Sequence, residues 1–210
     1  MEVINPTEVC YRAFELLKTK QFDDAEKLLS NCLAKIVDDD VASGLFHSTL
    51  GVLYKMKGEF KLAWRHYERA EKLIPNDPAL KIISARLLID EFSEFDQAVK
   101  KAKKVLALLP NNPAFCHQAH VTMGLAWAKK GDKKKALEAL KKSMEGDFEG
   151  FITAKNIDFN LCEAVLKKGW AEKEAKAFLE RAIAFAKKQE EPDWAETIQK
   201  MVDAFPKNSA

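Results

Sequence analysis

The sequence predicts an all-α protein, a solenoid of about five helix-turn-helix repeats closed by a C-terminal capping helix. Three observations support this fold class. The 210 residues include only 8 glycines and 7 prolines, which argues against a loop-rich all-β fold. Apolar residues recur three and four positions apart, which is the period of a helix. One arrangement of small and aromatic residues also returns along the chain, which indicates internal repeats.

The clearest repeat occupies residues 47–75. The apolar face of its first helix consists of Leu50, Leu53 and Tyr54, and that of its second helix consists of Ala63, Tyr67 and Ala70. Gly58 lies between the helices and can adopt the left-handed conformation at a helix end. Small residues at Gly51 and Ala63 let the two axes approach to the usual 8–10 Å. Pro75 ends the second helix because it has no N–H to donate.

These residues carry a family resemblance. Leu-Gly-x-x-Tyr at 50–54, Gly-x-Phe-x-x-Ala at 58–63 and Tyr-x-x-Ala at 67–70 resemble the tetratricopeptide repeat, a unit of about 34 residues. The alanine that opens each second helix recurs at Ala25, Ala63, Ala98, Ala136 and Ala175. A looser copy of the pattern consists of Gly124, Trp127, Gly131, Ala136 and Leu140. The resemblance implies that the hairpins stack into a right-handed α-α superhelix whose concave wall is lined by first helices.

We therefore expect one domain over residues 1–210. Its repeats are expected at 6–37, 42–75, 78–110, 113–145 and 152–188. Its helices are expected at 7–19, 23–36, 42–56, 60–73, 78–92, 95–108, 113–130, 133–144, 152–168, 172–188 and 192–204, the last as the capping helix. The two Pro-Asn-x-Pro segments at 75–78 and 110–113 mark the clearest boundaries, because one proline ends a helix and the next opens another. The buried stripe of the capping helix should be Trp194, Ile198 and Met201.

The first helices, phased on Gly51 and Gly124, predict the residues of the concave wall. The expected peptide-binding residues are Phe14, Leu45, Ser48, Thr49, Val52, Met56, Ile83, Ser84, Leu87, Val121, Thr122 and Leu125, and Val52, Leu87 and Leu125 should be the central contacts. Cys10, Leu17, Asn160 and Ala164 fall on the same wall. This set is apolar with a few hydroxyls, so it suits an extended apolar peptide or an amphipathic helix. The alternative is that part of the set packs between repeats. The wall lacks the cations with which one subset of the family holds a C-terminal carboxylate.

Basic residues are concentrated in the middle of the chain, where residues 97–146 hold 11 basic and 3 acidic side chains. The expected basic surface consists of Lys100, Lys101, Lys104, Lys130, Lys133, Lys134 and Lys135. It could attract an acidic partner or the phosphates of a nucleic acid. Few aromatic residues are interleaved to stack on bases, so we expect a solvated face.

The sequence offers little that would support catalysis. It contains no phosphate-binding loop, no zinc-protease motif and no nucleophile elbow. Cys116, His117 and His120 lie close together in sequence, but no further metal ligand adjoins them, so we expect them to have a structural role. We expect no catalytic residue, metal ion or cofactor. The four cysteines are dispersed, which favours reduced thiols.

The expected function is that of a non-enzymatic scaffold or adaptor that binds a segment of another protein in an apolar groove. No signal peptide or membrane-spanning apolar run is present, so we expect a cytoplasmic protein without membrane insertion. Two alternatives remain. One is a nucleic-acid-binding accessory protein that uses the lysines, and the other is a secretion-type chaperone for hydrophobic substrates.

Overall fold

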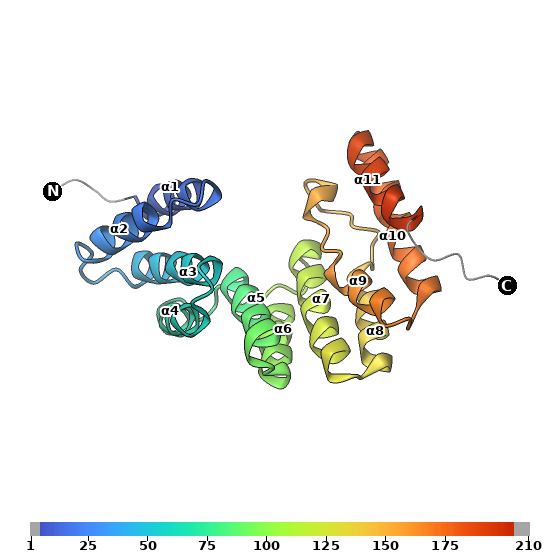
Figure 1. Cartoon of the computed structure of the whole chain (residues 1–210), viewed down its shortest axis with the longest axis horizontal. Helices are drawn as coiled ribbons and strands as arrows, with labels where there is room; N and C mark the ends of the chain where they lie inside the picture. Colours follow the sequence, from blue (N-terminus) through green and yellow to red (C-terminus); the bar gives the residue numbers. More distant parts are fainter. Residues whose placement is uncertain (1–4, 204–210) are drawn as a thin grey trace. The chain divides into compact units, whose positions relative to one another are not determined.

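A computed structural model of the chain describes residues 5–203, and over those residues it contains helices and no strand (Figure 1). The elements are α1 (Pro6–Lys18), α2 (Phe22–Leu33), α3 (Asp40–Met56), α4 (Phe60–Leu73), α5 (Pro78–Leu87), the π-helical turn η1 (Leu88–Phe92), α6 (Phe95–Leu108), α7 (Pro113–Lys130), α8 (Lys133–Ser143), the 3-10 helix η2 (Ala154–Asn156), α9 (Asn160–Lys167), α10 (Glu172–Lys188) and α11 (Pro192–Asp203). The predicted all-α fold class is confirmed. None of these helices is both long enough and apolar enough to cross a membrane.

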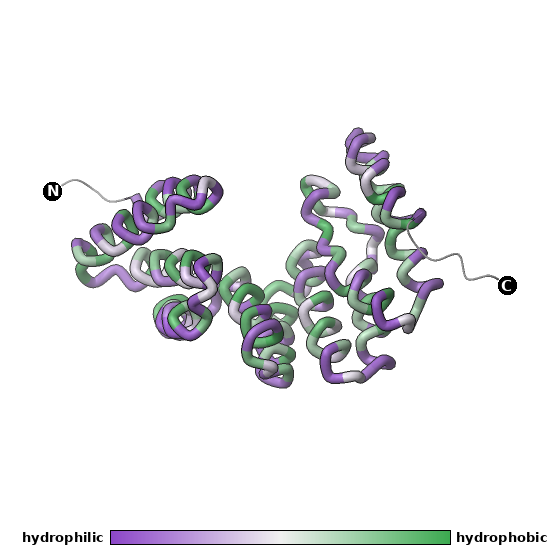
Figure 2. The backbone as a smooth tube through the Cα atoms, viewed as in Figure 1, coloured by the Kyte–Doolittle hydropathy of each residue, from purple (hydrophilic) through white to green (hydrophobic). Residues whose placement is uncertain are grey.

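Local sequence explains where most helices begin and end. The side chains of Asn5, Asp39, Asp77, Asn112 and Asp132 accept hydrogen bonds from backbone N–H groups in the first turns of α1, α3, α5, α7 and α8. Prolines follow three of these caps and open α1, α5 and α7. Gly131 ends α7 with φ of 85°, a left-handed conformation that glycine adopts without strain. Hydrophobic and hydrophilic residues are interspersed along the helices (Figure 2), and most helices have an apolar face to bury.

The chain divides into two compact units, residues 1–91 (unit 1) and residues 92–210 (unit 2). The division falls within η1, inside the expected third repeat of residues 78–110. The two helices of that repeat therefore belong to different units, α5 to unit 1 and α6 to unit 2. The expectation of one domain over residues 1–210 stays a prediction.

Unit 1 is held together by small residues that face large ones. Ala13, Leu29, Phe46 and Leu50 form one buried cluster, and Leu17, Ala25 and Leu53 form another. The helix α1 contacts α3 at Cys10 with Thr49, near Ala13 with Leu50, and near Leu17 with Leu53. Because these contacts advance together along both helices, α1 and α3 run parallel, as two first helices of stacked hairpins should.

The hairpin of α3 and α4 closes at a glycine. A Cβ atom added at Gly51 would overlap the ring of Tyr67, which is only 1% exposed. Helix α3 therefore approaches α4 more closely than any larger residue at this position would allow. The predicted role of Gly51 is confirmed. In unit 2 the missing Cβ of Gly124 makes room chiefly for Leu161 of α9 and also for Ala139 of the hairpin partner α8.

Unit 2 departs from the expected repeat after α8. The predicted helix over 152–168 is wrong in its first half, because residues 144–159 form a loop with η2 inside it and α9 begins only at Asn160. Gly146, Asp147, Phe148 and Gly150 all have φ between 51° and 88°, which no helix tolerates. The acidic side chain of Glu191 accepts hydrogen bonds from the Thr153 hydroxyl and the Ala154 N–H, and so fixes the loop to the start of α11.

The loop contributes aromatic side chains to the core of unit 2. Phe148 and Phe151 are buried and meet the ring of His117 edge to face at 5.6 and 5.4 Å between centroids. The Nδ1 atom of His117 lies 2.7 Å from the Ser143 carbonyl, and its Nε2 lies 2.9 Å from the Asp158 N–H. A carbonyl only accepts and an N–H only donates, so His117 is the neutral tautomer that carries its proton on Nδ1. The expected structural role of His117 is confirmed.

The terminal helix α11 packs on α10 and covers the end of unit 2, as the predicted capping helix should. Ile198 is fully buried, as expected. Trp194 and Met201 are only half-buried. Residue 204, the expected last residue of this helix, lies outside the described residues.

Candidate functional site

The first candidate site is an apolar row on α3 in unit 1. Its members, which we name the α3 stripe, are Val41, Leu45, Ser48, Val52 and Met56. Successive members are three or four positions apart, so at 100° per residue all five lie within an arc of about 80°. Val41 is 61% exposed and Met56 is 50% exposed, and the three members between them are half-buried.

Neighbouring helices flank the α3 stripe on both sides without covering it. On one side Thr49 is 3% exposed and donates hydrogen bonds to the Leu45 carbonyl at 3.0 Å and to Cys10 Sγ on α1 at 3.3 Å. On the other side Gly51 faces Tyr67 of α4. Since both flanks are packed, the stripe is the remaining face of α3. The sequence predicted four of its members, Leu45, Ser48, Val52 and Met56, as wall residues, but not Val41.

Phe14 on α1 extends the apolar surface beside the stripe. Its side chain is 39% exposed. Because α1 and α3 run parallel, with Ala13 packed near Leu50 and Leu17 near Leu53, Phe14 lies at the level of Val52. The predicted residues Phe14, Leu45, Ser48, Val52 and Met56 are thus brought together on one surface of unit 1.

The other predicted wall residues are placed differently. Ile83 is half-buried on α5, and Ser84 and Leu87 of the same helix are fully buried. The Ser84 hydroxyl donates to Glu71 at 2.6 Å, so its polar group is already satisfied. Burial makes Ser84 and Leu87 core residues, and Leu87 is not the central contact that the sequence suggested.

The same correction holds for the predicted residues of unit 2. Val121 and Thr122 are 0% exposed and Leu125 is 8% exposed. These residues lie on α7, which contacts α6, α8 and α9, and such a helix has few positions left for solvent. Thr49, Val121, Thr122 and Leu125 therefore stabilise the fold, and the alternative that part of the wall packs between helices applies to them.

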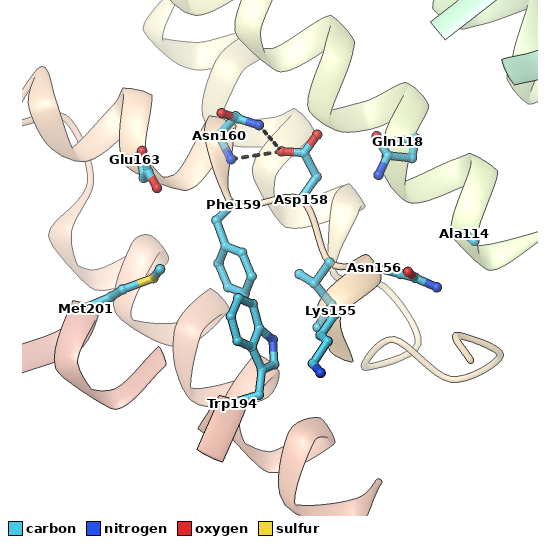
Figure 3. A pocket seen from close by; sticks show the side chains of 11 residues that line it. Ala114, Gln118, Lys155, Asn156, Asp158, Phe159, Asn160, Glu163, Trp194 and Met201 are labelled. Carbon is cyan, nitrogen blue, oxygen red and sulfur yellow. Dashed lines mark hydrogen bonds between the residues drawn. The ribbon is translucent and has the colours of Figure 1, made fainter. Parts of the chain in front are cut away.

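The second candidate site is an open hollow of ≈ 640 Å³ in unit 2, which the sequence did not predict. Figure 3 shows Phe159 and Trp194 side by side in its lining, with Met201 on one side and Lys155 on the other. The two aromatic rings meet edge to face, 6.3 Å between centroids. Phe159 ends the loop after η2, and the sequence assigned that loop to a helix, which is why this hollow was missed.

Polar side chains complete the lining of this hollow. Gln118 projects from α7, Asn156 from η2, and Asn160 from the start of α9 (Figure 3). Asn160 donates both its backbone N–H and its amide to the Asp158 carboxylate, at 2.9 and 2.6 Å. Of the wall residues that the sequence named, only Asn160 lines this hollow. The mixed lining can hold a polar or amphipathic group.

Histidine and tyrosine side chains form a polar cluster beside the α3–α4 hairpin. The Nδ1 atoms of His47 and His66 lie 3.0 Å apart, nearly on the line joining the ring centres, so one donates a hydrogen bond to the other. His66 stacks on Tyr54, whose hydroxyl donates to Glu26 at 2.8 Å. Burial and the neighbouring His66 lower the pKa of His47 to about 4, and burial lowers the pKa of His66.

The same cluster holds a half-buried contact between an acid and a phenol. Burial and the bond to Glu26 raise the pKa of Tyr54 to about 12, and that bond lowers the pKa of the Glu26 carboxyl. Lys57 also binds Glu26, at 3.2 Å. The His47–His66 hydrogen bond links α3 to α4, and the Tyr54–Glu26 hydrogen bond links α3 to α2. Across residues 5–203, no three His, Cys, Asp or Glu side chains are grouped to hold a metal ion.

The predicted basic surface lies on unit 2. Lys100, Lys104, Lys130, Lys133, Lys134 and Lys135 are exposed, and Lys101 is half-buried. Lys130 pairs with Asp96 at 2.6 Å, and Lys135 pairs with Asp132 at 2.8 Å. These acidic neighbours reduce the positive potential of the surface, which supports the expectation of a solvated face.

Comparison with solved structures supports a repeat architecture. PilW, described as a type IV pilus biogenesis factor, matches with a TM-score of 0.66 and 16% identity over 95% of this chain and 92% of its own. A thermophilic TPR protein of Thermus thermophilus matches with a TM-score of 0.63 and 17% identity over 93% of this chain and 100% of its own. The apo form of RapI matches with a TM-score of 0.67 and 16% identity over 98% of this chain and 78% of its own. No protein-family model and no curated protein matches the sequence.

Proposed function

The chain has the tetratricopeptide-repeat fold, and from this premise we propose that it is a non-enzymatic scaffold or adaptor that binds a segment of another protein. The observation that carries this proposal is the α3 stripe together with Phe14. Five apolar or hydroxyl side chains form one continuous row on a helix whose other sides are packed. An exposed apolar surface of this kind is typical of a protein interaction site.

The proposed contact is hydrophobic. Val41, Met56 and Phe14 are between 39% and 61% exposed, so each still has apolar surface that a partner can remove from water. Burial contributes about 25 cal/mol per Å² of such surface. Ser48 is the one polar member of the stripe and can form a hydrogen bond that fixes the register of the partner. An amphipathic helix or an extended apolar segment has the matching surface.

Substitution of an exposed member tests the proposal without disturbing the core. Met56→Glu places a charge in the stripe, and we expect it to abolish the stripe-dependent partners. Leu108→Glu is the matched control, because Leu108 is 37% exposed on α6, outside unit 1. Photo-crosslinking from position 48, followed by mass spectrometry of the captured proteins, identifies what contacts the stripe. An identical set of crosslinked proteins from Met56→Glu, at wild-type helicity, would reject the proposed surface.

The two alternative functions would use different surfaces of the protein. Nucleic-acid binding would use the lysines of unit 2, and the ion pairs of Lys130 and Lys135 with Asp96 and Asp132 do not favour it. It predicts an affinity that falls steeply with salt. A secretion-type chaperone would use the same α3 stripe, but for unfolded apolar segments rather than for one defined segment. Competition between unrelated unfolded proteins distinguishes that function from an adaptor.

A further inference from the structure

A second hollow, of ≈ 280 Å³, adjoins the hollow of ≈ 640 Å³ in unit 2. We name it the apolar hollow, because its walls consist of Phe159, Cys162, Leu166, Leu179 and Met201. Cys162 and Leu179 are only 1% and 2% exposed, so they form its inner wall. Phe159, Glu163 and Met201 line both hollows, which therefore lie next to each other.

The interior of the apolar hollow is free of charge. The charged residues in its lining are Glu163 and Lys167, two exposed side chains of α9 that pair with each other at 3.8 Å. They therefore lie at its rim. Burial of a hydrocarbon group against the remaining walls would remove apolar surface from water, which is favourable, whereas a charged group would lose its hydration there. The apolar hollow thus favours hydrocarbon.

An aromatic pair separates the apolar hollow from a lysine. Figure 3 shows Met201 and Lys155 on opposite sides of Phe159 and Trp194 in the larger hollow. Met201 is half-buried where the two hollows meet, and its flexible thioether side chain adapts to what it contacts. Apolar surface therefore leads from the apolar hollow, over the aromatic pair, to the ammonium group of Lys155.

Lys155 is the charged group that a ligand can still neutralise. It is exposed and has no ion-pair partner among residues 5–203. The acidic groups of the larger hollow already have partners. The Asp158 carboxylate accepts two hydrogen bonds from Asn160, at 2.9 and 2.6 Å. Glu163 pairs with Lys167. Charge complementarity therefore favours an anionic group beside Lys155 over a cationic one.

We propose that the two hollows together bind a free fatty carboxylate, with its hydrocarbon end in the apolar hollow and its carboxylate at Lys155. The chain of the ligand would cross Phe159 and Trp194 between these two ends. Ligand sites are commonly lined by apolar and aromatic side chains, with a few polar groups that fix the orientation. The site lies in unit 2, so this inference does not depend on the α3 stripe or on the proposed function.

Isothermal titration calorimetry of the whole protein with soluble amphiphiles, kept below their micelle concentrations, tests the proposal. Dodecanoate, decanoate and octanoate carry the same head on shorter and shorter chains. Their affinity should fall about fourfold for each buried methylene that is lost. Dodecyltrimethylammonium has the chain of dodecanoate and the opposite charge, and it should bind about fivefold more weakly than dodecanoate.

Substitutions at the two ends of the site provide the matched measurements. Lys155→Gln should weaken dodecanoate about threefold without weakening dodecyltrimethylammonium. Lys173→Gln is the control, because Lys173 is exposed on α10 and lines neither hollow, and it should change neither affinity. Leu166→Trp fills the apolar hollow and should weaken dodecanoate by about tenfold or more, since several methylenes are then excluded. Met201→Gln places an amide where the hollows meet and should act in the same direction. Circular dichroism of each variant checks that the helices remain formed.

Several results would overturn the inference. An affinity that does not change with chain length would exclude the apolar hollow, and equal affinity for the two dodecyl compounds would exclude the role of Lys155. Unchanged binding in folded Leu166→Trp and Met201→Gln would place the ligand elsewhere. Binding of dodecanoate only to a variant that ends at Asp203 would make residues 204–210 the occupant. A dimer that dodecanoate dissociates in sedimentation would make a second copy the occupant.

Discussion

The close approach of α3 and α4 at Gly51 leads to the most direct test of the fold. Gly51→Ala adds a single Cβ atom, which would overlap the ring of Tyr67. That ring is 1% exposed and lies in the interior of the hairpin, so it has little room to move. The substitution therefore forces either the ring or the helix axis to shift.

Two opposing contributions set the magnitude. Alanine favours a helix over glycine by about 1 kcal/mol, so on an open helix surface this change would stabilise the protein. Overpacking of a well-packed core costs about 1–3 kcal/mol. Because the overlap is with a buried aromatic ring rather than with the end of a flexible side chain, we expect the cost to prevail. The net destabilisation should be about 1–2 kcal/mol, and Gly51→Leu should exceed about 2 kcal/mol.

Urea unfolding followed by circular dichroism measures this loss, and hydrogen exchange of the α3 and α4 amides assigns it to unit 1. Tyr67→Ala provides the background for a double-mutant cycle, because alanine removes the Cδ1 and Cε1 atoms that the new Cβ would meet. In that background Gly51→Ala should cost much less or become stabilising. A neutral or stabilising effect of Gly51→Ala in the wild-type protein would refute the reasoning, since it would mean that the helices do not meet at this residue.

Three further predictions follow from buried polar groups. The Tyr67 hydroxyl is buried without a partner among the described residues, so Tyr67→Phe should leave stability unchanged or raise it by up to about 1 kcal/mol in urea unfolding. The pKa of His47 is depressed from 6.5 to about 4, so the unfolded chain binds its proton more readily, and stability should fall as the pH drops through that window. The full pKa shift of His47 corresponds to roughly 3 kcal/mol of unfolding free energy. Because the side chain is partly exposed, we expect a loss of about 1–2 kcal/mol. In urea unfolding across the same pH range, His47→Gln should lose less stability than the wild-type protein. His117→Leu removes hydrogen bonds to Ser143 and Asp158, and should destabilise unit 2 by about 3 kcal/mol in thermal unfolding, whereas equal stability would contradict the structural role.

Short-range signals in the sequence are enough to predict most of the helices. The Pro-Asn-x-Pro segments predicted the starts of α5 and α7 at Pro78 and Pro113, because a cap and a proline act within a single turn. The pairing of α3 with α4 was predicted from Gly51, since a glycine inside an apolar helix face indicates close packing. These features depend on neighbouring residues and need no knowledge of the rest of the fold.

The loop between α8 and α9 could not be predicted in the same way. Its conformation depends on contacts with residues far away in sequence, such as His117 and Glu191. Gly146 and Gly150 were a local sign that a helix was interrupted, and both have positive φ. The position of the phenylalanines in the core, however, follows from the aromatic residues of α7 and α10 that receive them. The hollow lined by Phe159 and Trp194 was missed for this reason.

The predicted wall residues are partly exposed on α3 and buried on α7, and the neighbours of each helix explain the difference. The sequence gives both helices apolar residues at the same repeat positions, so phasing on Gly51 and Gly124 treats them as equivalent. Packed neighbours flank α3 on two sides and leave Val41 and Met56 exposed to solvent. Helix α7 is packed by α6, α8 and α9, and every residue from Val121 to Ala126 is buried. The spacing of apolar residues predicts which face of a helix is buried. It does not predict whether the same chain or a binding partner covers that face. The exposed residues of α3 therefore make unit 1 the place to look for the partner.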